Sequence, residues 1–364
     1  MTTTSNYGRW KARAASAGRP TTAHLELTYR CNVQCRHCFQ DRHHAKDAMA
    51  LEDWKRVVDE AREAGVLVVT LSGGEALLSP HFWPLAEHIR ARGLAFRVFT
   101  NGVLLNKRNC RRLAALQPLS VEVSIFSLDP AVHDGVTQAP GSLRKALRGL
   151  AMLHYLGVTT KLKCPLLDTS TKDYADVRAL AERLGASVAF DPGITPRFNG
   201  DLAPTACRGD EHFLVEFFRD PQTRHHELKD LPPRKPGDAI CGIARTFTVV
   251  GPDGRVLPCV HIQQPVGNVK QEGLLRIWEH SPTLQKLRQT TYADLPTCNG
   301  CPRSGYCGRC SAVALLEDGD FHGPSSRACE LAELKEQAWG VPPPAGVREK
   351  TGTTAGKRLL QVLR

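Results

Sequence analysis

The sequence lacks any apolar run that approaches the roughly 20 residues a membrane helix needs. Its N-terminal stretch, MTTTSNYGRWKARAASAGRP, has no apolar core and therefore does not resemble a signal peptide. These absences predict a cytoplasmic protein without a membrane partner. In that reducing compartment the thirteen cysteines are better explained by metal binding than by a disulfide framework. The sequence therefore predicts a cytoplasmic metalloprotein.

Acidic residues are nearly absent from both ends of the chain. Residues 1–20 carry basic side chains and no acid, and residues 341–364 carry a single acid, Glu349, among several basic residues. Most of the formal net charge of +11 is thus placed at the ends. We interpret residues 1–20 and 340–364 as basic, solvated tails, and we do not expect nucleic acid to be a partner.

Strand and helix patterns alternate between residues 23 and 191. Helical periodicity is clear at 51–65, where Gly65 suits a helix end, and in a segment from Ser142, a plausible N-cap, to Gly157. Six strands alternating with helices predict an α/β fold with a parallel sheet, in the form of an open or partial (β/α)6 barrel. The strands are expected at residues 24–28, 66–72, 96–100, 121–127, 159–167 and 187–191.

The pattern changes after residue 191. Residues 192–213 and 228–239 are rich in proline and glycine and are interpreted as connecting loops. Residues 244–262 predict a β-hairpin that turns at GPDG, and a pair of short helices and a cysteine-rich segment follow. The expected domains are a core at 21–205, a linker at 206–237 and a small cysteine-rich domain at 238–335, between the two tails.

Three cysteines, Cys31, Cys35 and Cys38, follow the first expected strand on one loop. Structural zinc sites usually have four protein ligands, and disulfides need pairs. An iron–sulfur cube offers four irons to thiolates, so a loop that supplies three leaves one iron open to another ligand. A zinc site or a half-used binding loop is the alternative.

The spacing Cys-x₃-Cys-x₂-Cys directly after a first strand resembles the radical S-adenosylmethionine (SAM) superfamily. The resemblance implies that the three cysteines hold a [4Fe-4S] cluster whose open iron binds the amino and carboxylate groups of SAM. Reductive cleavage of SAM would then give a 5′-deoxyadenosyl radical that abstracts hydrogen from a substrate. His37 stands where the family usually has an aromatic residue packed on the adenine, although an ordinary loop histidine is the alternative.

The segment LSGGEALLSP after the second strand resembles the superfamily's glycine–glycine–glutamate motif. Gly73 and Gly74 would let the backbone approach the ligand closely, and Glu75 could accept hydrogen bonds from the SAM ammonium. The same resemblance places Thr100 and Ser124 near the cofactor. For Ser124 the alternative is a strand hydroxyl bonded to backbone.

Seven further cysteines lie in the C-terminal part and resemble the SPASM extension, which houses two auxiliary iron–sulfur clusters. The resemblance assigns Cys241, Cys259 and Cys310 to the nearer cluster, and Cys298, Cys301, Cys307 and Cys329 to the outer one. Seven thiolates cannot supply four ligands to each of two clusters, so Cys207, His261, water or substrate would complete the nearer site. The chain departs from the family in having two residues between Cys307 and Cys310, where three are usual. Two structural zinc sites are the alternative.

Several residues remain without an assigned role. Cys110, Cys164 and Cys207 are most simply small buried hydrophobic residues. No catalytic acid or base can be named, although Asp191, His261 and Glu122 are polar and near the expected mouth of the barrel. Gly254, in the GPDG turn, is expected to let the backbone reverse before Cys259.

The resemblance implies a radical SAM oxidoreductase that modifies a peptide in the maturation of ribosomally made natural products (RiPPs). The expected change is oxidative: a crosslink, a thioether or a dehydrogenation. The expected partners are a precursor peptide, a flavodoxin or ferredoxin electron donor, and a separate leader-binding protein, because only thirty residues precede Cys31. The alternatives are a dehydrogenase or epimerase acting on a small biosynthetic intermediate, and a non-enzymatic metal-binding or electron-transfer protein.

Overall fold

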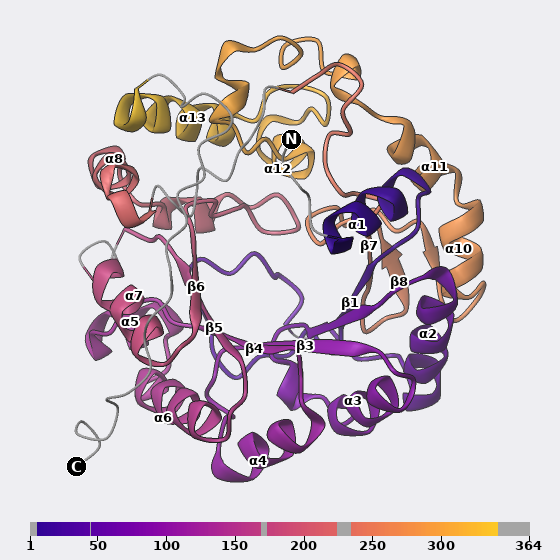
Figure 1. Ribbon diagram of the computed structural model, residues 1–364, viewed down its shortest axis with the longest axis vertical. Helices are drawn as coiled ribbons and strands as arrows, with labels where there is room; N and C mark the ends of the chain where they lie inside the picture. Colours follow the sequence, from indigo (N-terminus) through magenta and orange to yellow (C-terminus); the bar gives the residue numbers. More distant parts are fainter. Residues whose placement is uncertain (1–5, 44, 169–172, 224–233, 341–364) are drawn as a thin grey trace.

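A curved sheet of parallel strands organises the first half of the molecule (Figure 1). The computed structural model describes residues 6–43, 45–168, 173–223 and 234–340. The predicted α/β fold is confirmed, with strand ends that shift by up to three residues from the expected ones. The strands lie in the order β6 to β1 across the sheet: β1 (Thr22–Glu26), β2 (Val68–Ser72), β3 (Ala95–Thr100), β4 (Ser120–Ser124), β5 (Thr160–Pro165) and β6 (Ser187–Asp191).

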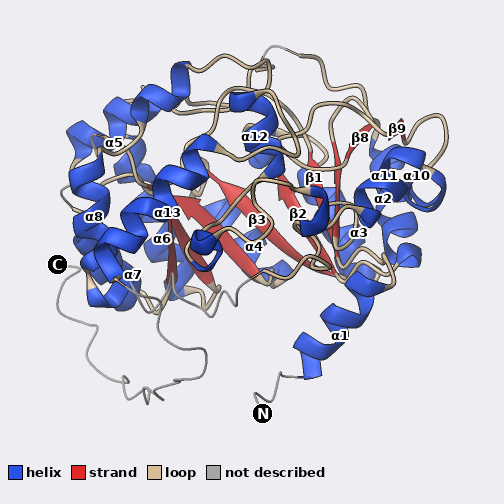
Figure 2. Ribbon diagram, turned by 90° about the horizontal axis from the view of Figure 1, so that it is seen from above, coloured by secondary structure: helices blue, strands red, loops and turns tan. Residues whose placement is uncertain are grey.

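Helices follow the strands and lie on the outer side of the curved sheet (Figure 2). They are α2 (Leu51–Ala64), α3 (Phe82–Ala91), α4 (Lys107–Leu116), α5 (Pro130–Thr137), α6 (Ser142–Tyr155) and α7 (Tyr174–Arg183). Helix α2 ends as predicted at Gly65, which has a φ of 108°. Among the described residues, no helix is both long enough and apolar enough to cross a membrane.

The start of α6 differs from the prediction by one residue. Gly141 is the N-cap, and Ser142 is already the first helical residue. The carboxylate of Asp134, in α5, accepts hydrogen bonds from the Ser142 hydroxyl at 2.8 Å and from the Leu143 amide at 3.0 Å. A carboxylate from the preceding helix thus caps α6, which a local sequence pattern does not reveal.

The N-terminal region contains a helix, α1 (Asn6–Ser16), where a solvated tail was expected. Ala14 is buried, and the carbonyl of Gly18 accepts a hydrogen bond of 2.8 Å from the Trp278 indole. The predicted tail at residues 1–20 is therefore wrong for its described part, because charge composition does not report this long-range contact. Of the tail predicted at 340–364, residues 341–364 lie outside the described residues.

The predicted hairpin is confirmed and extends the same sheet. Strand β7 (Phe247–Val250) pairs in parallel with β1, and β8 (Arg255–Leu257) and β9 (Gly267–Asn268) follow antiparallel, so that one sheet has nine strands in the described chain. Gly254 has a φ of 82° in the turn, as its expected role requires. The sequence did not indicate that this hairpin would join β1.

The segments interpreted as connecting loops contain helical structure. A 3₁₀ turn, η2 (Ala203–Cys207), precedes α8 (Glu211–Arg219), whose buried phenylalanines pack with α13 (Ser326–Trp339). The expectation of loops is therefore wrong here, because the apolar face of α8 is covered by a helix more than a hundred residues later in the sequence. The remaining elements are α10 (Leu274–His280), α11 (Pro282–Gln289), α12 (Ser311–Asp318) and the 3₁₀ turns η1 (Ala76–Leu78), η3 (Tyr292–Asp294) and η4 (Pro302–Gly305).

The two faces of the sheet differ in chemistry. The outer face carries apolar residues such as Leu25, Val98 and Leu162, which form the main core with the surrounding helices. The inner face carries charged residues, including Arg97 and Lys163. Parallel sheets are usually apolar on both faces because both are buried, so the polar inner face marks the functional side.

Candidate active site

The loop after β1 places three cysteines around one cavity. Cys31, Cys35 and Cys38 line a cavity of about 710 Å³, together with polar residues of the same loop and Arg197 from the segment after β6. The end of α5 holds the loop, because the backbone amides of residues 34 and 36 donate to carbonyls of residues 137 and 136. The cavity volume lies in the range typical of small-molecule and cofactor sites.

The three thiols are neighbours in a partly desolvated environment. Burial is the main cause that raises the pKa of each, and for Cys35 the nearby Cys38 and Cys31 raise the pKa further. Within the described part of the chain, no group of three or more Cys, His, Asp or Glu side chains is arranged to hold a metal ion. A zinc ion needs every ligand within about 2.3 Å of one point, whereas thiols of an iron–sulfur cluster bind separate irons. The donor set, three soft thiols beside one cavity, fits the cluster.

The glycines of the GGE turn pack against the cysteine loop. A Cβ on Gly73 would lie 2.2 Å from the Thr28 carbonyl oxygen, and one on Gly74 would lie 2.4 Å from that of Arg30. The amide of Gly74 donates to Thr28 and that of Glu75 donates to Arg30, at 2.8 and 2.9 Å. The two glycines were expected to let the backbone approach a ligand closely. In this structure they let it approach the backbone just before Cys31. Contact of the two glycines with SAM stays a prediction.

Glu75 lies fully buried between the GGE turn and the end of β3. Its carboxylate accepts hydrogen bonds from the Thr100 hydroxyl at 2.9 Å, from the Asn101 amide at 2.8 Å and from the Leu77 amide at 3.2 Å. Burial raises the pKa of Glu75 to about 7, and these donors oppose the increase. In this conformation Glu75 and Thr100 bind each other, so their expected contacts with SAM remain predictions.

Two residues that the sequence did not single out contact the cysteine sulfurs. Asn101 places its side-chain amide nitrogen 3.6 Å from the Cys31 sulfur and 2.8 Å from the Asn32 side-chain oxygen. His43 has one ring nitrogen 3.8 Å from the Cys38 sulfur and the other 3.2 Å from a backbone carbonyl. The signal available for Asn101 was its place directly after Thr100, at the end of the third strand. His43 follows Cys38 by five residues and has no comparable signal.

His37 and Ser124 lie at the same end of the sheet. The His37 ring packs edge-on against Phe126, with 4.9 Å between ring centroids, and burial lowers its pKa to about 4. Its Nδ1 has no hydrogen-bond partner among the described residues. Ser124 ends β4 and is paired in register with Lys163 of β5. The roles of both residues toward SAM stay predictions.

The C-terminal cysteines form two groups in space. Cys310 and Cys241 raise the pKa of Cys259, after burial, to about 12, which places these three thiols together. A second set is identified by Cys307, whose pKa is raised by burial and then by its neighbours Cys329, Cys298 and Cys301. The structure thus groups the cysteines as the resemblance divides them, and their role as cluster ligands stays a prediction.

Comparison with known proteins agrees with both cysteine regions. Residues 25–181 match the Radical SAM superfamily, and residues 241–302 match SPASM, an iron–sulfur cluster-binding domain. This chain contains a radical SAM domain followed by a SPASM domain. A radical SAM domain binds a [4Fe-4S] cluster and SAM, and the SPASM domain binds auxiliary iron–sulfur clusters.

The SPASM-containing chain is similar to several characterised relatives over most of its length. It is 27% identical to mycofactocin maturase MftC of Mycolicibacterium smegmatis, with 93% of this chain and 90% of MftC covered. It is 27% identical to the subtilosin biosynthesis protein AlbA of Bacillus subtilis (81% and 68% covered), and 24% identical to the AdoMet-dependent heme synthase of Methanosarcina barkeri (84% and 95%). The crystal structure of Streptococcus suis SuiB bound to precursor peptide SuiA has the same fold, with a TM-score of 0.68 at 15% identity over 89% of this chain and 80% of SuiB.

The two extra candidate ligands of the nearer SPASM cluster differ in position: Cys207 lies away from Cys259, whereas the backbone of His261 contacts the Cys259 thiol. Cys207 packs with Phe126 and with Cys35 of the radical SAM loop. The structure therefore does not bring it to the group of Cys241, Cys259 and Cys310, called the Cys241 set below. The His261 ring contacts Phe39 at 5.4 Å between centroids, and its Nδ1 is buried without a partner among the described residues. Cys110 and Cys164 are buried in the main core, as predicted for small hydrophobic residues.

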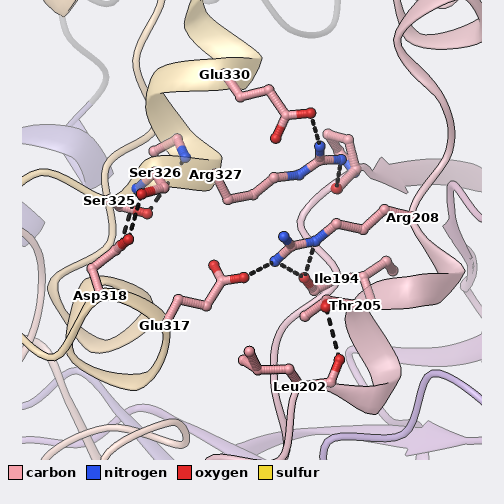
Figure 3. A network of polar contacts seen from close by, with 12 residues as sticks. Ile194, Leu202, Thr205, Arg208, Glu317, Asp318, Ser325, Ser326, Arg327 and Glu330 are labelled. Carbon is pink, nitrogen blue, oxygen red and sulfur yellow. Dashed lines mark hydrogen bonds and ion pairs between the residues drawn. The ribbon is translucent and has the colours of Figure 1, made fainter.

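Polar contacts fasten the SPASM region to the radical SAM core (Figure 3). Arg208 donates to the carbonyl of Ile194 at 2.7 Å and forms an ion pair of 2.5 Å with Glu317 of α12. Arg327 of α13 donates to the carbonyl of Pro192 at 2.9 Å. Both arginines therefore tie the segment after β6 to the C-terminal helices, which lie opposite β3 and β4 in Figure 1.

Proposed function

We propose that this protein cleaves SAM reductively and uses the resulting radical to modify a peptide during the maturation of a ribosomally made natural product. The observation that carries the proposal is the placement of three thiols on one loop beside a cavity, at the mouth of a sheet with a polar inner face. Cys31, Cys35 and Cys38 would hold an iron–sulfur cluster, which when bound would supply the one-electron reduction of SAM from which a hydrogen-abstracting radical is made.

The chain's own residues would position and isolate this reaction. The end of α5 and the GGE turn fix the cysteine loop from two sides through backbone hydrogen bonds. Glu75 holds the end of β3 through the Asn101 amide, and Asn101 in turn donates toward the Cys31 sulfur. Such preorganisation matters because a carbon radical must meet one target hydrogen and no water.

An oxidative outcome is supported by charges near the first SPASM set. Arg309 and Arg245 are close enough to Cys241 to lower its pKa against the larger effect of burial. Positive charge and hydrogen bonds near cluster sulfurs raise a reduction potential. The Cys241 set would therefore accept the electron that a substrate radical loses when it becomes a crosslink, a thioether or a double bond.

The relatives support a peptide as the substrate. MftC is named a maturase, AlbA is named for the biosynthesis of a bacteriocin, and the SuiB structure contains its precursor peptide. We further propose an acidic electron donor, such as a flavodoxin or ferredoxin, because Arg30, Arg36 and Arg197 line the cavity of the cysteine loop. A separate leader-binding protein would deliver the precursor.

A small-molecule substrate is the second candidate, and one relative favours it. The heme synthase of M. barkeri covers 84% of this chain, and its name describes a tetrapyrrole product. The neighbouring genes would separate the two candidates: a short precursor reading frame supports the peptide, whereas genes for sugar nucleotides or cofactors would favour the small molecule.

The direct test is anaerobic reconstitution of the whole chain with iron and sulfide. We expect a brown protein with about eight to twelve irons per chain. We also expect SAM to perturb its electron paramagnetic resonance spectrum and dithionite to produce 5′-deoxyadenosine. A colourless protein, or a cluster whose spectrum is indifferent to SAM, would show that the proposal is wrong.

A further inference from the structure

The inner face of the sheet carries a set of charged residues that the proposed cluster chemistry does not use. In register across the parallel strands, Glu122 of β4 is paired with Phe99 of β3 and with Lys161 of β5. Lys163 lies two residues beyond Lys161 on the same face, and Arg97 lies two residues before Phe99. Paired residues of parallel strands point to the same side, so all five face the interior.

Two of these cations share a single carboxylate. Arg97 lies 3.8 Å and Lys163 lies 3.6 Å from opposite oxygens of Glu122. Both distances are longer than a hydrogen bond, and the Ser120 hydroxyl is closer to the same carboxylate, at 3.3 Å. The side chains of Arg97 and Lys163 are each 34% exposed, whereas that of Glu122 is only 5% exposed. The cations therefore have donors to spare, and they are accessible from the interior.

The surroundings compensate the positive charge only in part. The Nε of Arg97 is buried and has no hydrogen-bond partner in the described chain. The Lys163 ammonium lies over the Phe99 ring, 3.2 Å from its centroid, and Lys161 adds a further cation nearby. His24 faces the same interior, and burial with these cations lowers its pKa to about 4, so it is neutral. Asp191, at the end of β6, also attracts the Lys163 ammonium but is exposed.

We propose that Lys163 and Arg97 bind a carboxylate of the peptide substrate inside the barrel. This inference rests on the proposed function and names the substrate group that the site selects. A carboxylate is the anion that fits, since a lysine and an arginine that share one buried acid on the same face of the sheet keep N–H donors that this acid does not bind. The sulfonium of SAM is positive and would be repelled by this interior. The carboxylate can come from an acidic side chain or from the C-terminus of the peptide.

Binding of matched short peptides to the reconstituted protein tests the proposal. The first pair is a capped five-residue peptide with one glutamate at its centre and its glutamine counterpart. The second pair is capped penta-alanine with a free or an amidated C-terminus. Saturation-transfer NMR would measure the weak affinities. We expect at least one acid to bind about tenfold more tightly than its amide, the size of one charge-assisted hydrogen bond. The pair that shows this difference identifies the source of the carboxylate.

Variants tie the discrimination to the site. Lys163→Gln should remove the preference for the acid, and Lys163→Arg should restore most of it. Lys145→Gln, on the exposed outer face of α6, is the matched control and should behave as the wild type. Iron content and circular dichroism establish that each variant is folded and loaded.

Three outcomes would overturn the inference. One is equal binding, or no binding, of acid and amide by the wild type. A second is an unchanged preference in Lys163→Gln. The third is a larger loss of affinity for SAM than for the peptide in that variant, which would assign the site to the SAM carboxylate. A wild type that cleaves SAM without distinguishing the peptides contradicts only this inference. A wild type that distinguishes them without cleaving SAM contradicts only the proposed function.

Discussion

The two cysteine regions are held in different ways. The loop of Cys31, Cys35 and Cys38 is fixed by the ends of β2, β3 and α5, through backbone bonds and the side chain of Asn101. The segment from Cys298 to Cys310 combines short turns of its own, in which the amide of Cys301 donates to the carbonyl of Cys298, with contacts to α13, such as the ion pairs of Arg303 with Glu333 and Glu336. The first site is therefore built on the ends of the sheet strands, whereas the second is built from short turns and a C-terminal helix outside the sheet.

The thiols with the highest exposure, Cys241 and Cys329, belong to the second region. Cys35 is packed against apolar residues of α5 and the segment after β6, while Cys329 is exposed and lies near the acids Glu333 and Asp318. A preformed site needs little folding energy from its metal, whereas thiols on short turns gain their order when they bind it. The comparison predicts that loss of one ligand has different consequences in the two regions.

Cysteine substitutions should give the largest effect. We expect Cys35→Ala to reduce production of 5′-deoxyadenosine by more than about a hundredfold, because the cluster that receives SAM loses an anchor. Cys301→Ala should retain measurable SAM cleavage, although peptide modification is lost. Iron content and product analysis by mass spectrometry would measure both. Cys110→Ala, which removes a thiol of the main core, is the control and should keep the full iron content. Equal loss of cleavage in the first two variants would mean that the SPASM metal supports the whole fold.

Glycine substitutions test how tightly each loop is packed. An alanine at Gly74 would place its Cβ 2.5 Å from the Tyr29 carbonyl oxygen, so we expect Gly74→Ala to lower the free energy of unfolding by about 3 kcal/mol. At Gly308, between Cys307 and Arg309, no atom lies within 4 Å of an added Cβ. Gly308→Ala should therefore be neutral within about 0.5 kcal/mol. Urea unfolding followed by circular dichroism measures both. A tolerated Gly74→Ala would show that the first loop is not preformed.

Asparagine substitutions compare the sulfur environments. Asn101→Leu removes the donor to the Cys31 sulfur, and loss of such a donor lowers the reduction potential of an iron–sulfur cluster. We expect a more negative midpoint potential of the SAM-binding cluster in a redox titration followed by electron paramagnetic resonance, with the iron content retained. The matched variant is Asn299→Leu, at an exposed position next to Cys298, and it should leave every potential unchanged. An unchanged potential in Asn101→Leu would remove Asn101 from the site.

The sequence predicted those features of the fold that depend on local patterns. The strands, the helix ended by Gly65 and the hairpin at Gly254 were predictable, because periodicity and positive φ are local properties. The pairing of β7 with β1 and the contact of Trp278 with Gly18 were not, because they join residues more than two hundred positions apart.

The same limit applies to side-chain partners within the site. The motif identified Glu75, but the sequence could not show that its carboxylate is enclosed by Thr100 and Asn101 from the next strand. It likewise gave no indication that Arg97, Glu122 and Lys163, on three separate strands, share one interior space. Such contacts are set by the register of the sheet, which a spacing pattern along one strand does not contain.

Acidification should give the smallest change in the free energy of unfolding, and this change should come from the radical SAM domain. His133 of α5 is buried, its Nδ1 accepts a hydrogen bond of 3.3 Å from the Phe126 amide, and burial lowers its pKa to about 4. The folded state thus favours the neutral ring, so the stabilisation is complete above the ordinary pKa of 6.5 and is lost as the pH falls toward 4.

The wild type should lose free energy of unfolding between pH 7 and pH 5. We expect this loss to be smaller in His133→Gln by on the order of 1 kcal/mol. His280→Gln, at an exposed position in α10 near the SPASM hairpin, should keep the wild-type pH dependence. If both variants show the same pH profile as the wild type, the buried histidine beside the cysteine loop does not set the acid sensitivity of this region.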